Sequence, residues 1–308
     1  MSSRPSLYLF DFFYGAGFGS EVNNLAYAIF YFEQHGLDYR IISRNWVSAY
    51  ERGWNDYFTS LAAQHQIECP RNRRVQIVVS LDVALRAHVS RRHYFRMRYR
   101  FLPYLFQSVL HPECYVRRNQ NFALLREYAH EFRESNPDVF MEYMRSILKR
   151  IWSLHDHIAE AAAAHRPPQP YLAVHVRRGD KVTSGEDRHF ALEEYVAAIL
   201  SVDGPARTLF VMSDDSRVVM EFKRMLPDYA ISCFGAAERW GYDQGDFETL
   251  PKSEVRQETE CLIAEVEIAR EADVFIGTLG SNLFRLLTYL RTGECIDISR
   301  SKLSLANL

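Results

Sequence analysis

The segment YLAVHVRRGDK, from Tyr171 to Lys181, combines two features that decide the fold of the chain. Its first part, YLAVHV, is apolar apart from one histidine, which is typical of a strand buried on both faces. Three positive charges and one negative charge follow directly after Val176. Ligands of parallel sheets bind at the carboxyl ends of the strands, so this charged loop is a candidate site as well as the end of a strand.

Downstream of this segment, helix-like and strand-like stretches alternate. Apolar strands are predicted at TLFVMSD (208–214), YAISCF (229–234), DVFIGT (273–278) and ECIDIS (294–299). Helices are predicted around LEEYVAAIL (192–200), up to about Leu226, from Val255 to Ala272 and after Gly280. This alternation predicts an α/β protein whose C-terminal half is a doubly wound, Rossmann-like parallel sheet.

Upstream, the chain opens with an apolar run, a glycine-rich turn and an apolar-periodic segment from about Glu21 to Gln34, which predict strand, turn and helix. Further strands are predicted at 38–43 and 75–80. A helix is predicted from the capping sequence SNPD (135–138) to about His165. RPPQP (166–170) cannot continue a helix, so we expect two lobes, an N-terminal α/β lobe with a helical insert (1–165) and a Rossmann-like lobe (166–308).

Composition excludes several classes of protein. The chain has 308 residues with 37 Lys+Arg against 39 Asp+Glu, and this near-balance argues against a nucleic-acid partner. The five cysteines form no CxxC pair, which argues against a thiolate metal site. The apolar runs are too short for a membrane span and the N-terminus lacks a signal-peptide pattern, so we expect a soluble chain. The arginine-rich segment 71–100 fits the solvated face of helices better than a surface for an anionic acceptor or a membrane.

Four polar clusters directly follow predicted strands. They are GAGFGSEVNN (15–24), HVRRGDK (175–181), SDD (213–215) and TLGSN (278–282). Because the carboxyl ends of parallel strands meet at one edge of a sheet, these clusters are expected in the cleft between the two halves.

Each cluster has a chemical and a structural interpretation. Arg177 and Arg178 could bind phosphate oxygens in a planar fork, or could belong to a solvated loop with an internal ion pair. Gly17 and Gly19 could let the backbone approach an anion, although the GxGxG spacing is not the dinucleotide-binding GxGxxG and can be a tight turn only. Ser281, with the amides that follow it, could bind a diphosphate or simply cap a helix.

A metal site is not expected. Asp214 and Asp215 are adjacent carboxylates, but the doublet opens a predicted helix, where carboxylates are favoured anyway. No HExxH motif is present, and no GxSxG motif marks a serine nucleophile.

At HVRRGDKV the sequence resembles the α-1,6-fucosyltransferase family, which includes the core N-glycan enzyme of animals and the rhizobial nodulation enzyme. The glycine-rich turn, LEEY (192–195), MSDD (212–215) and IAEVEIAREADVFIGTLGSNLFR (263–285) follow in the order of that family. The resemblance implies a two-lobed, GT-B-like fold and an inverting, metal-independent transfer of fucose from GDP-fucose to a glycan or glycoconjugate hydroxyl, in α-1,6 linkage. It also implies no cofactor beyond this donor, and by itself would allow a Golgi or secretory location.

The resemblance carries roles to individual residues. It puts Arg177 on the donor diphosphate with Ser281 and Asn282 beside it, and His175 and Glu265 on guanosine. Gly17 and Gly19 correspond to the turn beside the donor. Further active-site positions, by the same resemblance, are Arg178, Asp180, Lys181, Tyr195, Asp214 and Asp215.

Two alternatives stay open at the level of sequence. Glu186 is the nearest match to the catalytic base of the family, but the segment from Val182 to LEEY is one residue longer here, so Asp187 could take that position. The activity could also differ, as a transferase of the same fold with another sugar nucleotide or as a non-catalytic protein that binds a nucleotide or glycan.

Overall fold

The computed structural model describes residues 7–12, 17–43, 46–61, 114–115, 120–179, 190–234 and 243–299. The predicted strand at 75–80 and the arginine-rich segment 71–100 lie outside these ranges. So do four candidate site residues, Asp180, Lys181, Glu186 and Asp187.

The N-terminal sheet is parallel and has the strand order β2-β1-β3 among the described residues. Its strands are β1 (Leu7–Asp11), β2 (Tyr39–Ile42) and β3 (Cys114–Tyr115). The predicted strand and helix are confirmed, with α1 spanning Phe18–Gln34. This helix starts three residues before the predicted position, because the carbonyl of Gly17 already accepts the amides of Ser20 and Glu21 at 2.9 and 3.2 Å. A short 3-10 helix, η1 (Gly53–Asp56), follows β2.

The C-terminal sheet is the predicted parallel, doubly wound sheet. Its strands are β4 (Leu172–Val176), β5 (Thr208–Ser213), β6 (Ala230–Ser232), β7 (Val274–Gly277) and β8 (Glu294–Asp297). They lie in the order β6-β5-β4-β7-β8, all parallel. The order reverses between β4 and β7, where the chain first runs outward to one side and then returns to extend the sheet on the other. This is the Rossmann arrangement, and the reversal marks where its ligands bind.

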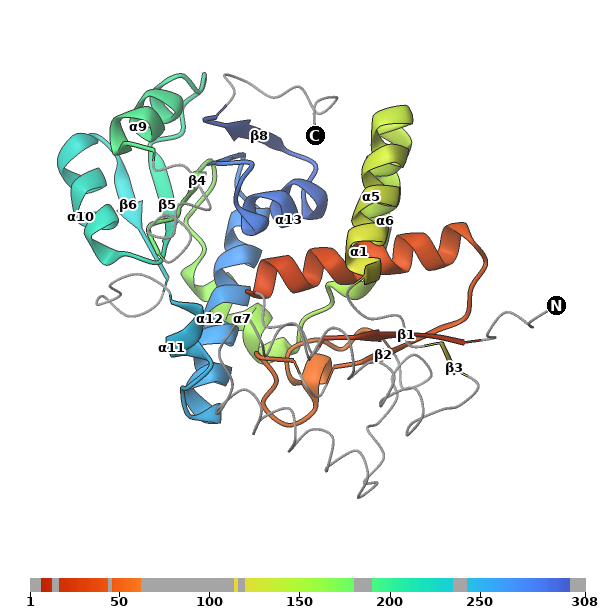
Figure 1. Ribbon diagram of the computed structural model, residues 1–308. Coiled ribbons are helices and arrows are strands. Elements are labelled where there is room, and N and C mark those ends of the chain that lie inside the picture. The colour runs from red at the N-terminus through yellow and green to blue at the C-terminus, as the bar shows by residue number, and fades with distance from the viewer. Residues whose placement is uncertain are drawn as a thin grey trace.

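Helices cover both faces of this sheet (Figure 1). Helices α9 (Leu192–Leu200) and α10 (Ser216–Met225) lie on one face, and α12 (Lys252–Arg270) and α13 (Asn282–Leu290) connect the strands on the other. The loop predicted between residues 235 and 253 contains a further short helix, α11 (Gln244–Phe247).

The prediction of one helix from residue 135 to 165 was wrong. The structure has α5 (Gln120–Ser135), α6 (Pro137–Ile151) and α7 (Asp156–His165). The chain leaves the helix after Ile151 because its main-chain groups bond elsewhere. The carbonyl of Ser153 accepts the amide of Thr59 at 2.7 Å, and the amide of His155 donates to the carbonyl of Tyr57 at 3.0 Å.

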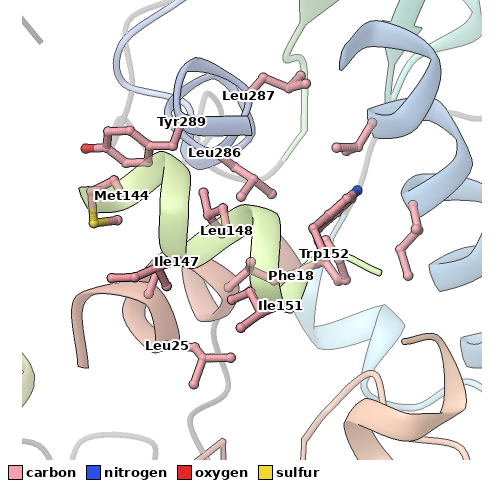
Figure 2. Packing of buried hydrophobic residues seen from close by; sticks show 14 of the residues in the cluster. Phe18, Leu25, Met144, Ile147, Leu148, Ile151, Trp152, Leu286, Leu287 and Tyr289 are labelled. Carbon is pink, nitrogen blue, oxygen red and sulfur yellow. The ribbon is translucent and has the colours of Figure 1, made fainter. Parts of the chain in front are cut away.

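One hydrophobic core, here called the shared core, connects the two halves. Helix α6 lies between α1 and α13, and apolar side chains of all three interdigitate (Figure 2). The shared core includes Phe18 and Leu25 of α1, Met144, Ile147, Leu148 and Ile151 of α6, and Leu286, Leu287 and Tyr289 of α13. A second cluster, the outer core, fills the space under α9 and α10 with Val174, Val176, Phe190, Tyr195, Val218 and Phe222 among others. The boundary between residues 165 and 166 stays a prediction.

Candidate active site

The candidate site lies at the carboxyl edge of the C-terminal sheet, where the strand order reverses. Strands β4 and β7 are hydrogen-bonded neighbours there, with Val174 opposite Ile276. The loop that starts with Arg177 and the turn that ends with Ser281 therefore leave the sheet side by side. Two of the four polar clusters predicted from the sequence meet at this edge, and the SDD cluster follows β5, the neighbour of β4 on its other side.

Asp214 holds the main chain of the arginine loop. The amides of Arg178 and Gly179 donate to the two carboxylate oxygens of Asp214, each at 2.8 Å. In the residue before it, the hydroxyl of Ser213 donates to the carbonyl of Val176 at 2.9 Å. Charge-assisted hydrogen bonds of this kind are short and strong, so the SDD cluster fixes the path of the chain directly after β4.

Asp215 has a different partner. It is the N-cap of α10, where its side chain accepts the amide of Arg217 at 2.9 Å and pairs with the Arg217 guanidinium. Hydrogen bonds from that side chain hold the pKa of Asp215 below its usual range. The interpretation of the Asp214–Asp215 doublet as the start of a helix is therefore confirmed for Asp215.

The TLGSN turn is held from two sides. Ser281 has no exposed surface, and its hydroxyl oxygen accepts the amide of Leu283 at 3.3 Å as the N-cap of α13. The carboxylate of Asp297, at the end of β8, accepts the amide of Leu279 at 3.1 Å. The first turn of α13 thus starts at a fixed position beside the arginine loop, with its amide dipoles directed at this edge of the sheet.

The glycine-rich turn of the N-terminal half lies against this same turn. A Cβ atom on Gly19 would come within 3.0 Å of Leu283 Cδ2 and 3.1 Å of the main-chain carbon of Asn282. Gly17 has more room, since its nearest neighbour would be Gln244 Oε1 of α11 at 3.7 Å. The glycines predicted a close approach of the backbone to an anion. At Gly19 the structure shows a close approach of the backbone to the start of α13.

His175 and Glu265 lie on the same side of the sheet. His175 alternates with residues of the outer core along β4, so its side chain is on the face covered by α12, the helix that carries Glu265. Both side chains are buried. Burial, and then the charge of Arg177, lower the pKa of His175 to about 3, so its imidazole is neutral at physiological pH. The Nδ1 atom is buried and makes no hydrogen bond with any described residue.

Tyr195 lies on the opposite face. It belongs to the outer core, where its ring is buried between α9 and the sheet. The structure therefore brings together Gly19, Arg177, Ser281 and Asn282 around the strand reversal, with His175 and Glu265 on the α12 side and Tyr195 on the α9 side.

Sequence reasoning missed two residues that hold the site. One is Asp297. Its position as an acidic residue at the carboxyl end of an apolar strand could have indicated its role. The other is Asn23, whose amide donates to the carbonyl of Asn282 at 2.9 Å. Asn23 belongs to the glycine-rich cluster GAGFGSEVNN. Its contact with Asn282 could not be predicted, because no local sequence pattern indicates a contact between residues 259 positions apart.

Within the described residues, no three His, Cys, Asp or Glu side chains gather in a way that could hold a metal ion. Across those residues, none of the helices combines the length and apolar character needed to cross a bilayer.

No known family model matches the chain. An α-(1,6)-fucosyltransferase of Drosophila melanogaster is 39% identical over 71 residues, which cover 20% of this chain and 11% of the fly protein. The matched stretch thus spans little more than a tenth of that relative.

Solved structures match over nearly the whole chain. The fucosyltransferase NodZ from Bradyrhizobium has a TM-score of 0.54 at 15% identity, covering 96% of this chain and 95% of its own. NodZ α-1,6-fucosyltransferase co-crystallized with GDP gives 0.53 at 14% identity, with coverage of 96% and 95%. POFUT1 in complex with GDP-fucose gives 0.52 at 10% identity, with coverage of 96% and 98%. The resemblance drawn from the sequence is confirmed in the fold, and the chain has the predicted α/β, GT-B-like architecture.

Proposed function

We propose that this protein is an inverting, metal-independent glycosyltransferase that moves fucose from GDP-fucose to a glycan hydroxyl in α-1,6 linkage. The observation that carries the proposal is the junction at the strand reversal. There the arginine loop held by Asp214 and the first turn of α13 leave the sheet side by side. The fold is shared with fucosyltransferases that were crystallised with GDP and with GDP-fucose.

The diphosphate would lie between Arg177 and the first turn of α13. When the sugar leaves, negative charge develops on the β-phosphate of GDP. A fixed guanidinium and the amide dipoles of a helix start can stabilise that charge without reorganising, which is the task that a metal ion performs in other transferases. Ser281 would act here chiefly by fixing where α13 begins, since its hydroxyl accepts the amide of Leu283.

The transfer itself is a single displacement. The acceptor hydroxyl oxygen forms a bond to the anomeric carbon of fucose while the bond from that carbon to the β-phosphate oxygen breaks. The electron pair of the broken bond stays on GDP, and the proton of the hydroxyl passes to a carboxylate. Glu186 or Asp187 would supply this carboxylate.

The guanine base would lie on the α12 side of the sheet, near His175 and Glu265. A carboxylate suits the N–H donors on the Watson–Crick edge of guanine. A neutral imidazole offers one donor and one acceptor and leaves no net charge beside the base. With a pKa of about 3, His175 would keep this form over the whole physiological range.

Calorimetric titration in EDTA tests the proposal. Wild-type protein is titrated with GDP-fucose and, separately, with UDP-glucose, and the first titration is repeated with Arg177→Ala. Arg224→Ala is the control, because within the described part of the chain this exposed arginine pairs only with Glu221 of its own helix. Binding of GDP-fucose alone, abolished in Arg177→Ala and kept in the control, supports the donor assignment. Preference for UDP-glucose would indicate another sugar nucleotide, and failure to bind either would favour a non-catalytic protein.

A further inference from the structure

Arg178 connects three separate segments of the site. Its main-chain amide donates to Asp214 Oδ1 at 2.8 Å, which ties the turn after β4 to the turn after β5. Its side chain reaches in another direction, and Nη1 donates to the main-chain carbonyl of Phe190 at 2.7 Å. Phe190 comes two residues before the start of α9. Arg178 thus binds the beginning of α9 to the carboxyl edge of the sheet.

The start of α9 has no polar N-cap side chain. Its N-cap is Ala191, which has no side chain that could accept a main-chain amide, and the Glu194 carboxylate accepts the amide of Ala191 at 2.8 Å. The Phe190 ring is buried in the outer core, but burial of a ring does not satisfy the carbonyl of the same residue. A guanidinium hydrogen bond to that carbonyl is charge-assisted, and no neutral residue could replace it at equal strength.

The two neighbouring arginines act on opposite sides of the sheet. Arg177 is close enough to His175 for its charge to lower the pKa of His175. Because His175 lies on the α12 side of the sheet, Arg177 acts on that side. Arg178 bonds to Phe190, whose ring belongs to the outer core on the α9 side. A single loop can therefore bind the donor through Arg177 and hold the start of α9 through Arg178.

We propose that Arg178 is a positioning residue that fixes the start of α9 against the arginine loop and does not bind the donor. Gly179 and Phe190 are the described residues that flank Glu186 and Asp187 in the sequence. Arg178 fixes the separation of these two flanking residues through its hydrogen bond to the carbonyl of Phe190. The inference rests on the proposed function for its catalytic consequence, though not for the anchoring contact itself.

The test compares Arg178→Ala and Arg178→Lys with Arg177→Ala, using Arg224→Ala as the exposed control. Three quantities are measured: the Kd for GDP by calorimetry, kcat and KM for GDP-fucose consumption with water as the acceptor, and amide hydrogen exchange of residues 191–195 without nucleotide. We expect Arg178→Ala to keep the GDP Kd and the GDP-fucose KM within threefold of wild type. Its kcat should fall at least tenfold, and exchange at 191–195 should be at least tenfold faster. Arg178→Lys, which keeps the charge, should recover part of both losses.

Several outcomes would overturn the inference. A GDP Kd that rises in Arg178→Ala as much as in Arg177→Ala would make Arg178 a donor ligand. Unchanged exchange at 191–195, or an unchanged kcat, would remove its positioning role. If the wild-type protein does not bind GDP at all, the proposed function fails, and hydrogen exchange still decides whether Arg178 anchors α9.

Discussion

The side-chain amide of Asn23 donates a hydrogen bond of 2.9 Å to the main-chain carbonyl of Asn282, which joins the second turn of α1 to the start of α13. Asn23 is 1% exposed, so its side chain is shielded from solvent. Helix α1 follows a strand of the N-terminal sheet, and its start belongs to the glycine-rich sequence. Helix α13 follows β7 of the C-terminal sheet. The two halves of the candidate site are therefore in direct contact through main-chain and side-chain atoms.

Gly19→Ala should disturb this contact. The new Cβ would lie 3.0 to 3.1 Å from Leu283 Cδ2, the Leu283 amide nitrogen and the main-chain carbon of Asn282, so the start of α13 must shift. We expect a loss of about 1–3 kcal/mol in the free energy of unfolding, the usual cost of overpacking. Because α13 starts at the proposed diphosphate position, GDP affinity should fall as well. Urea unfolding and GDP calorimetry measure the two effects.

Gly17→Ala is the matched control for this prediction. Gly17 has φ −63° and ψ 156°, which alanine adopts without strain, and its nearest neighbour would be at an ordinary contact distance of 3.7 Å. Its unfolding free energy should stay within about 0.5 kcal/mol of wild type. Equal stability of the two alanine variants would contradict the close approach of α1 and α13.

The sequence predicted the C-terminal sheet well because each of its signals is local. Apolar runs mark the strands, and polar clusters at their ends mark the ligand edge. The break between α6 and α7 could not be predicted in this way, because it depends on hydrogen bonds from residues 153–155 to residues 57–59. The same limit applies to Gly19, whose local sequence does not show that the backbone it approaches belongs to α13.

Local signals also left the roles of polar residues open. Ser281 was equally compatible with capping a helix and with binding a phosphate, and Asp214 with Asp215 could have been one functional pair. The structure separates the two aspartates, since Asp214 accepts two amides of the arginine loop while Asp215 caps α10. Adjacent residues acquire different tasks because their side chains leave the chain in different directions, which the sequence alone does not specify.

Asp214→Asn should weaken the arginine loop. An asparagine has one oxygen and one NH₂ group where the carboxylate has two oxygens, so one of the amides of Arg178 and Gly179 would face a donor. We expect a loss of about 1–3 kcal/mol in unfolding free energy. GDP affinity should fall too, because the loop also carries Arg177. A variant with wild-type stability and wild-type GDP affinity would show that the two hydrogen bonds do not shape the loop.

The hydroxyl groups of Tyr27 and Tyr289 form a buried pair between α1 and α13, with an O–O distance of 3.2 Å. Burial raises the pKa of Tyr289 well above its usual value, so this hydroxyl stays protonated. Each single Phe substitution should cost about 1–2 kcal/mol, because it leaves the other hydroxyl buried without this partner. The double variant should cost less than the sum of the singles, and a double-mutant cycle by urea unfolding measures the difference. Strict additivity would mean that the two hydroxyls do not interact.

His175 should make the stability of the protein depend on pH in a predictable direction. Its pKa is about 3 in the folded chain and 6.5 in the unfolded chain, because burial, followed by the charge of Arg177, disfavours the imidazolium. As the pH falls below 6.5, the unfolded state takes up a proton that the folded state does not, so unfolding becomes easier by up to about 1.4 kcal/mol per pH unit. The loss continues down to the folded pKa.

His175→Gln, which does not titrate, lacks this contribution, so between pH 6.5 and 4.5 the wild type should lose about 2 kcal/mol more unfolding free energy than the variant. Urea unfolding of both proteins across this range gives the comparison, and the slope with pH, unlike the absolute stability, is insensitive to any packing defect that glutamine introduces. Parallel curves for the two proteins would mean that His175 takes up its proton at the same pH in the folded and the unfolded chain, and that burial does not lower its pKa.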